Sequence, residues 1–325
     1  MDKNKEYIDQ ARGFCSAIHD ELKKSVIGFH SELEHLDIAF LTGGHVLLEG
    51  VPGLAKTLFV RSLAKAAGLK FKRIQFTPDL MPSDITGSLF YNEEKQDFKF
   101  IEGPLFANIV LADEINRTPP KTQAALLESM QEKSVTVAQN SHKTPDPFFV
   151  FATQNPIEQE GTYPLPEAQL DRFLFKLILD YPSLEDEKKI ALLRNDPESE
   201  SIQPIAGIEH LQKIQHAVQH ILCAEDLVDE IIRLVASTRP GREGSTKEVN
   251  QFVEWGAGPR ASKWILSAAK ARAALSGRYH VDREDIKFVT PAILRHRILL
   301  NYHSLAENLT TDRLIENLIR EKLPR

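Results

Sequence analysis

A short glycine-containing segment holds the first residues whose types and spacing could do chemistry. It lies between a short apolar run and a helical pattern, and it contains Gly50, Val51, Pro52, Gly53, Leu54, Ala55, Lys56 and Thr57. A loop in that position can bind phosphate, because its backbone N–H groups and the helix N-terminus present unpaired donors. Lys56 would neutralise the β and γ phosphates of ATP, and the Thr57 hydroxyl would bind Mg²⁺. The generic pattern has glycine before the lysine, so Ala55 leaves a turn that binds nothing as the alternative.

Two acidic residues follow a second apolar run. Ile109–Ala112 leads directly into Asp113 and Glu114, which places two carboxylates at the C-terminal end of a buried strand. Ligands of α/β sheets bind at that end. Asp113 fits the carboxylate that holds Mg²⁺ through water, and Glu114 fits the base that polarises an attacking water. An acidic loop or helix cap is the alternative for an isolated pair, but after a phosphate-binding loop the pair predicts hydrolysis of ATP.

A polar amide follows a third apolar run. Phe148–Thr153 continues into Gln154, Asn155 and Pro156. We expect Asn155 to sense the γ-phosphate and to orient water, with Thr153 as the second choice. An asparagine that only forms a turn before Pro156 is the alternative.

Five short runs separated by helical patterns indicate the fold class. The runs are His45–Leu48, Phe71–Phe76, Ile109–Ala112, Phe148–Thr153 and Phe173–Leu179. We take them as apolar throughout rather than alternating, which is typical of strands buried on both faces of a parallel sheet. The expected fold is therefore α/β, a three-layer αβα core with a five-stranded parallel sheet. Ile85–Ile101, which reads as a hairpin, and Val135–Asp146 do not fit as crossover helices, so we expect β insertions there.

Helical patterns flank this α/β region on both sides. The apolar spacing from Ile8 to about Leu41 predicts two helices, interrupted around Ser25 to Gly28. A polar stretch predicts a linker over residues 195–204, and the pattern after it is almost entirely helical. We therefore expect N-terminal helices and the α/β core over 1–194 and a smaller all-α domain over 205–325.

Composition narrows the class of protein. The 325 residues are 42% hydrophobic and 26% charged, with a net charge of −6 and two cysteines. This balance is that of a globular protein of about two domains, and it gives no basic surface for nucleic acid. Two cysteines without metal-ligand spacing fit a reducing compartment. No apolar run approaches the roughly 20 residues that span a bilayer, so we expect a cytoplasmic protein.

Taken together, the motifs resemble those of one ATPase family. The order Gly-X-Pro-Gly-X-Ala-Lys-Thr, Ala-Asp-Glu-Ile-Asn-Arg, Ala-Thr-Gln-Asn-Pro, Pro-Glu-Ala-Gln-Leu-Asp-Arg-Phe and Gly-Pro-Arg-Ala is similar to that of the MoxR branch of AAA+ P-loop proteins, over about residues 20–300. In that family alanine is the expected residue at position 55. The two β insertions resemble those of the helix-2-insert clade, and the all-α domain resembles the AAA+ lid.

This resemblance implies roles for further residues. Arg172 matches the arginine finger, which reaches the γ-phosphate of a neighbouring subunit, and Arg117 is a rival for that role. Arg260 matches sensor 2, which couples the lid to the nucleotide. Val26 and Ile27 lie in a segment that resembles the lining of the adenine pocket. The segment 294–297 also recurs in the family, and we assign it no chemistry beyond helix packing or an interface.

The resemblance also implies a function. It is that of a Mg²⁺-dependent, chaperone-like ATPase that works as a ring, with a hexamer expected, and remodels or activates a partner protein. The natural partner by resemblance is a von Willebrand factor A domain protein. A nucleic-acid motor is one alternative, disfavoured by a pI near 6.0 and by an insertion, Val135–Asp146, whose one cationic side chain is Lys143. A nucleotide-dependent switch with little hydrolysis is another, but it would require the loss of Glu114 or Arg172.

Overall fold

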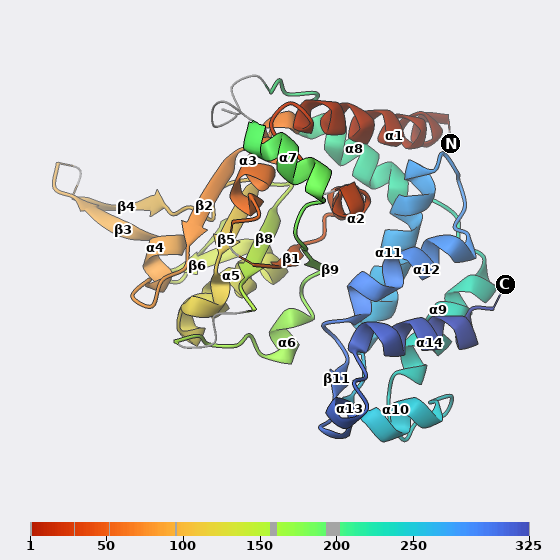
Figure 1. Ribbon diagram of the computed structural model, residues 1–325. Coiled ribbons are helices and arrows are strands. Elements are labelled where there is room, and N and C mark those ends of the chain that lie inside the picture. The colour runs from red at the N-terminus through yellow and green to blue at the C-terminus, as the bar shows by residue number, and fades with distance from the viewer. Residues whose placement is uncertain are drawn as a thin grey trace.

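A five-stranded parallel sheet forms the centre of the molecule (Figure 1). The computed structural model describes residues 2–28, 30–51, 53–94, 96–156, 161–192 and 202–324. In the order in which they lie side by side, the strands are β2 (Phe71–Gln75), β5 (Ile109–Asp113), β8 (Phe149–Gln154), β1 (Val46–Glu49) and β9 (Phe175–Ile178). Every neighbouring pair is parallel. The predicted parallel sheet is confirmed.

The strands differ in how completely they are buried. Residues Ile109–Ala112 of β5 and Phe149–Thr153 of β8 are buried throughout, as expected for central strands covered on both faces. The expectation of an apolar strand is wrong for β2, where Lys72 and Arg73 are exposed. Because β2 lies at the edge of the sheet, charged side chains there meet solvent and also discourage pairing with another strand.

Helices cover both faces of the sheet and complete three layers. Alternate residues of β8 belong to two separate apolar cores, Phe149 and Phe151 to one and Val150 and Ala152 to the other. The first core includes α1 (Asp2–Leu22), α2 (His30–Thr42) and α3 (Lys56–Ala66), and the second includes α4 (Pro82–Thr86) and α5 (Pro120–Glu132). The predicted αβα arrangement and the two N-terminal helices are confirmed.

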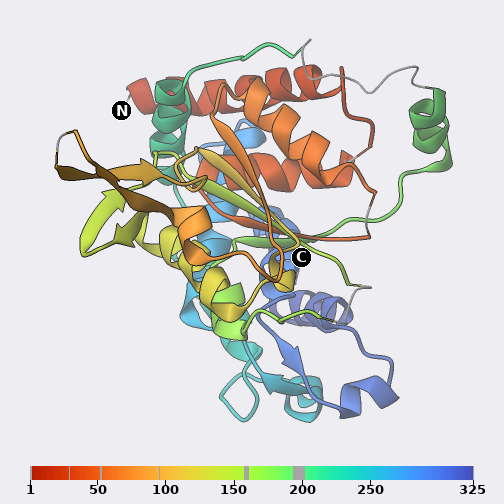
Figure 2. The same cartoon turned by 90° about the vertical axis from the view of Figure 1, so that its left-hand side faces the viewer.

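Both predicted β insertions are hairpins. The first consists of β3 (Gly87–Asn92) and β4 (Asp97–Glu102), and the second of β6 (Ser134–Val137) and β7 (Asn140–Lys143). Ile85 belongs to the short helix α4 rather than to the first hairpin. The β3–β4 hairpin extends away from the rest of the fold in both orientations (Figure 1 and Figure 2).

The C-terminal part is helical with one exception. It contains α8 (Ile208–Gln219), α9 (Glu225–Ser237), α10 (Lys247–Phe252), α11 (Pro259–Leu275), α12 (Arg283–Leu294), α13 (His303–Ala306) and α14 (Thr311–Lys322). The expectation of an all-α domain is wrong in one detail, because β10 (Val253–Trp255) and β11 (Leu299–Leu300) form an antiparallel ladder. Two strands this short give no periodicity that a sequence could reveal.

The predicted linker at 195–204 falls mainly outside the described residues, which resume at Ile202 after α7 (Leu184–Leu192). Its described end is packed, since Ile202 is fully buried and the Gln203 N–H donates to a Glu21 carboxylate oxygen at 2.9 Å. The domain boundaries stay a prediction. Among the described helices, none combines the length and the apolar character needed to cross a bilayer.

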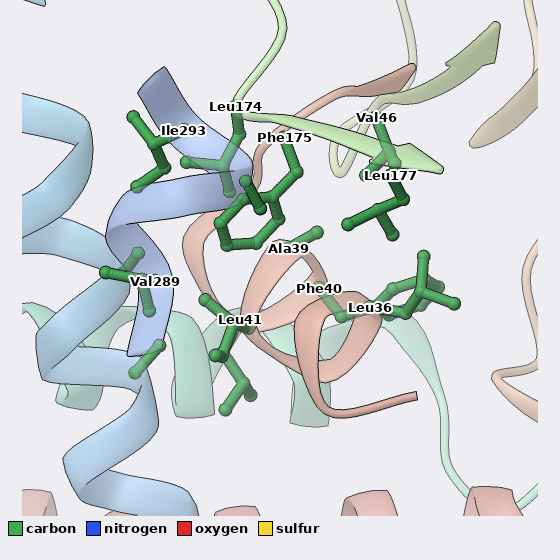
Figure 3. Close-up of a cluster of buried hydrophobic side chains, with 14 of the residues drawn as sticks. Leu36, Ala39, Phe40, Leu41, Val46, Leu174, Phe175, Leu177, Val289 and Ile293 are labelled. Atoms are coloured by element: carbon green, nitrogen blue, oxygen red, sulfur yellow. The ribbon is translucent and has the colours of Figure 1, made fainter. Parts of the chain in front are cut away.

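Helix α2 lies between the sheet and the C-terminal helices. The ring of His35 stacks on Phe288 of α12, with centroids 4.5 Å apart, and meets Phe175 of β9 edge-on at 5.1 Å. Figure 3 shows apolar side chains of the same three elements in one cluster, including Leu36, Ala39, Phe40, Phe175, Leu177, Val289 and Ile293. One continuous core therefore joins the α/β part to the helical part.

A buried histidine, His45, lies at the amino end of β1. His45 is 8% exposed, and its Nδ1 accepts the Val150 N–H at 3.0 Å while its Nε2 lies 3.3 Å from the Met130 carbonyl oxygen. The ring must be neutral to accept at Nδ1. Burial lowers the pKa of His45 to about 4 from an ordinary 6.5.

We predict that this histidine makes stability depend on pH. Between pH 6.5 and pH 4 the unfolded chain binds a proton on His45 that the folded chain does not. The contribution of His45 to the free energy of unfolding is therefore largest above pH 6.5 and falls by about 3 kcal/mol toward pH 4. Denaturant unfolding of the wild type and of His45→Asn across this range checks it. The variant should be less stable at pH 7 and show a shallower pH dependence, whereas equal slopes would contradict the assignment.

Candidate functional site

The carboxyl ends of three adjacent strands meet the loop after β1 around one cavity of about 340 Å³. Its lining residues are Gly53, Leu54, Ala55, Lys56, Thr57, Asp113, Glu114, Thr153, Gln154 and Asn155. Because β5, β8 and β1 are parallel neighbours, the residues that follow them lie at one edge of the sheet. The structure thus brings together Lys56, Thr57, Asp113, Glu114 and Asn155, which the sequence analysis had singled out from three separate segments.

The loop from Gly50 to Thr57 has the backbone geometry of an anion-binding turn. Gly53 and Ala55 both have positive φ angles, 86° and 52°, and Ala55 directly precedes α3. Consecutive turns of this kind expose backbone N–H groups at a helix N-terminus. Gly50 is required for a different reason, since a Cβ there would lie 2.8 Å from the Leu179 carbonyl oxygen. Pro52 lies outside the described residues.

The Lys56 ammonium is folded back over this loop. Its Nζ donates to the Gly50 carbonyl oxygen at 2.6 Å. Burial lowers the pKa of Lys56 from its usual value, while the carboxylates of Asp113, Glu114 and Glu49 oppose that shift. A phosphate group in the cavity would satisfy this cation better than a neutral carbonyl does, because charge-assisted hydrogen bonds are stronger.

Asp113 is the centre of a polar network at the end of β5. The Thr153 hydroxyl donates to Asp113 Oδ1 at 2.6 Å, and the Thr57 hydroxyl lies 3.4 Å from Oδ2. Arg73 Nη2 donates to Oδ2 at 2.7 Å. A carboxylate and a hydroxyl are the hard oxygen donors that Mg²⁺ prefers, so these residues fit the ion.

Glu114 is held in a constrained position beside that network. Its φ angle of 56° is left-handed, which is uncommon for a residue with a side chain. Its Oε2 accepts from Gln75 Nε2 at 2.7 Å and from Arg117 Nη1 at 3.0 Å. The Glu114 N–H donates to the Thr153 hydroxyl at 2.8 Å, so one threonine orients both acids.

Two residues of this network were missed by the sequence analysis. Arg73 and Gln75 both lie on β2, and their side chains reach Asp113 and Glu114 because β2 pairs with β5 in register, Gln75 opposite Asp113. The signal in the sequence is that the run Phe71–Phe76 contains polar residues, which a strand buried on both faces would not.

Comparison with known proteins identifies the family. The ATPase family associated with various cellular activities (AAA) matches residues 45–175, and the AAA lid domain matches residues 245–318. The chain is 42% identical to the chaperone MoxR1 of Mycobacterium tuberculosis, over 95% of this chain and 84% of that protein. The chain belongs to the MoxR family of AAA+ ATPases. It is also 31% identical to protein MoxR of Methylorubrum extorquens, over 89% and 88% of the two chains.

A solved structure supports the same family. The crystal structure of an ATPase candidate from Cytophaga hutchinsonii superimposes with a TM-score of 0.88 at 44% identity, covering 97% of this chain and 96% of the other. The expected P-loop AAA+ fold with a helical lid is confirmed.

Four other candidate residues lie outside the walls of the cavity described above. Arg172 instead lines a separate hollow of about 300 Å³ against α5, beside Glu128 and Glu132. Arg260, the second residue of α11, pairs with Asp171 at 3.0 Å. Val26 and Ile27 lie between α1 and α2, and Val26 packs against the apolar core. The structure does not gather these residues with Lys56.

The backbone conformation of Ala55 is unfavourable for a residue with a side chain. Ala55 is exposed and left-handed, with φ 52° and ψ 24°, a conformation that costs about 1 kcal/mol for a residue with a Cβ. We predict that Ala55→Gly raises the free energy of unfolding by about that amount. Denaturant unfolding measures it. Ala124→Gly, at an exposed position inside helix α5, is the matched control and should lower the free energy of unfolding by about 1 kcal/mol. A loss of stability in both variants would contradict the strain at Ala55.

Proposed function

We propose that this MoxR-family protein binds ATP with Mg²⁺ and hydrolyses it. The observation that carries the proposal is that Lys56, Thr57, Asp113, Glu114 and Asn155 line one cavity beside a helix N-terminus. A cation, two oxygen ligands, a carboxylate base and an amide are the groups that phosphoryl transfer to water requires. Adenine contacts at Val26 and Ile27 rest on family resemblance alone.

Each side chain has a separate task in the proposed reaction. Lys56 leaves the Gly50 carbonyl and neutralises the β and γ phosphates, while Thr57 and Asp113 would hold the metal. Mg²⁺, when bound, neutralises charge that develops on the phosphoryl oxygens. Glu114 takes a proton from the attacking water, and Asn155 orients that water.

The proposed base must first change partners. In this structure Glu114 Oε2 accepts from Gln75 Nε2 and from Arg117 Nη1, so these donors occupy the oxygen that would take a proton from the water. Hydrolysis therefore requires that Glu114 turn from these groups toward the water. Arg117 pairs with Glu114 of the same chain. This contact favours Arg172 as the arginine finger.

We further propose that the active form is a ring, with a hexamer expected. Arg172 is the candidate finger, and it lies in a hollow separate from the cavity of its own chain. A guanidinium supplied by a neighbour would complete each site only when subunits meet. Arg260 is the proposed sensor 2, on the first turn of α11 in the lid.

The proposed work of the cycle is remodelling or activating a partner protein in the cytoplasm. The name chaperone given to the M. tuberculosis relative supports this direction. A von Willebrand factor A domain protein is the partner that we propose by family resemblance. A nucleic-acid motor is disfavoured by the net charge of −6, and a switch without hydrolysis by the presence of both Glu114 and Arg172.

We predict that Glu114→Gln binds MgATP as the wild type does but hydrolyses it at least ~10²-fold more slowly, the scale of losing a general base. Calorimetric titration and steady-state phosphate release measure the two properties. Lys56→Ala is the control, because it should lose binding itself. Normal hydrolysis by Glu114→Gln would remove this residue as the base, and wild-type ATP affinity in Lys56→Ala would remove the phosphate-binding assignment.

We predict that Arg172 acts across a subunit boundary. Arg172→Ala and Lys56→Ala should each be inactive alone, whereas mixing them should restore hydrolysis, since some interfaces then pair an intact cavity with an intact finger. An in-trans finger is worth ~10³-fold or more in rate. Phosphate release across mixing ratios, with co-assembly verified by light scattering, provides the measurement. If co-assembled mixtures stay inactive, Arg172 works within its own chain or Arg117 is the finger.

A further inference from the structure

One carboxylate connects the helical lid to the segment that carries the candidate finger. Asp171 Oδ2 accepts from Arg260 Nη1 at 3.0 Å, and its Oδ1 accepts from Arg297 Nε at 2.7 Å. Arg260 lies at the start of α11 and Arg297 just beyond α12, both within the residues that match the AAA lid. Asp171 itself follows α6 (Glu167–Leu170) and directly precedes Arg172.

The two arginines are held very differently. The side chain of Arg297 is 1% exposed, and its Nη2 also donates to the carbonyl oxygens of Asp171 at 2.9 Å and Phe173 at 2.6 Å. Burial lowers the pKa of Arg297 to about 10, so it stays charged at neutral pH and needs these acceptors. The side chain of Arg260 is 43% exposed, and it pairs with the Asp171 carboxylate through Nη1.

These contacts fix Arg297 in place and leave Arg260 able to exchange its partner. Removing Arg297 from Asp171 would leave a buried cation without its counter-ion, which is strongly unfavourable. Removing Arg260 breaks only a partly exposed ion pair, which costs little. An anion that binds Arg260 more strongly, such as a phosphate group, would therefore displace Asp171 from it.

We propose that Asp171 is a positioning residue that pairs with Arg260 and yields it to the terminal phosphate of bound ATP. This inference rests on the proposed function, in which Arg260 serves as sensor 2. Asp171 directly precedes Arg172 in the chain and stays bound to Arg297. When Arg260 leaves Asp171 for ATP, the carboxylate beside the candidate finger loses one of its two cationic partners. Asp171 thereby connects the nucleotide of one subunit to the arginine that this subunit presents to the next.

The exchange predicts a specific competition in binding. Asp171 and the γ-phosphate compete for Arg260, so removing the charge at position 171 should favour ATP and leave ADP unaffected. Asp171→Asn keeps an oxygen acceptor for Arg297 while it removes the charge. We expect this variant to bind a non-hydrolysable ATP analogue about three- to fivefold more tightly, the scale of a partly exposed ion pair.

A double-mutant cycle tests the proposal. Calorimetric titration with the ATP analogue and with ADP is run on the wild type, Asp171→Asn, Arg260→Ala and the double variant. In the Arg260→Ala background, Asp171→Asn should no longer change the affinity for the analogue. ADP affinity should be the same in all four proteins, and it also reports that the cavity is folded.

Several outcomes would overturn the proposal. Tightening of the same size for ADP, or tightening that persists without Arg260, would show that Asp171 does not act through that arginine. Unchanged analogue affinity in Asp171→Asn with normal ADP binding would exclude the competition. Arg260→Ala keeps the idea testable if Asp171→Asn lowers the melting temperature, because an unchanged preference for the analogue over ADP in Arg260→Ala contradicts it as well. A wild type that binds neither nucleotide would instead overturn the proposed function on which it rests.

Discussion

The parallel pairing of β8 between β5 and β1 is the constraint on which the site depends. Strand register places Leu48 beside Thr153 and Ala112 beside Ala152, so the residues that follow the strands emerge at the same height. The backbone hydrogen bonds between the strands and the two apolar cores fix the relative positions of these residues. The acids, the threonine and the phosphate-binding loop are thereby positioned by the buried central strands of the sheet.

The charges at this edge balance one another in the structure. Asp113 is paired with Arg73, Glu114 with Arg117 and Gln75, and the ammonium of Lys56 with a carbonyl oxygen. Each of these side chains is partly accessible. Under the proposed function, MgATP would replace these partners.

Much of the fold could be predicted from sequence because buried parallel strands leave a local signal. Runs such as Ile109–Ala112 are apolar on both faces, and the motif residues follow them immediately. Gln75 and Arg73 left no comparable signal, since their role depends on which strand lies beside β5. Likewise, Arg297 contacts Asp171 across 126 positions of sequence, so its contribution could not be inferred from the neighbourhood of either residue.

The position of α2 between the sheet and the lid has a consequence for how the protein can be divided. The His35 ring of α2 contacts β9 and α12, and the apolar residues of α2 belong to the core that both share, so neither part has a complete core alone. A fragment ending before the lid would expose the surfaces that α2 and α1 bury against α8 and α11, and exposed apolar surface of that kind promotes aggregation. Core and lid should therefore unfold in a single cooperative transition rather than melt as two independent domains, despite the separate families that they match.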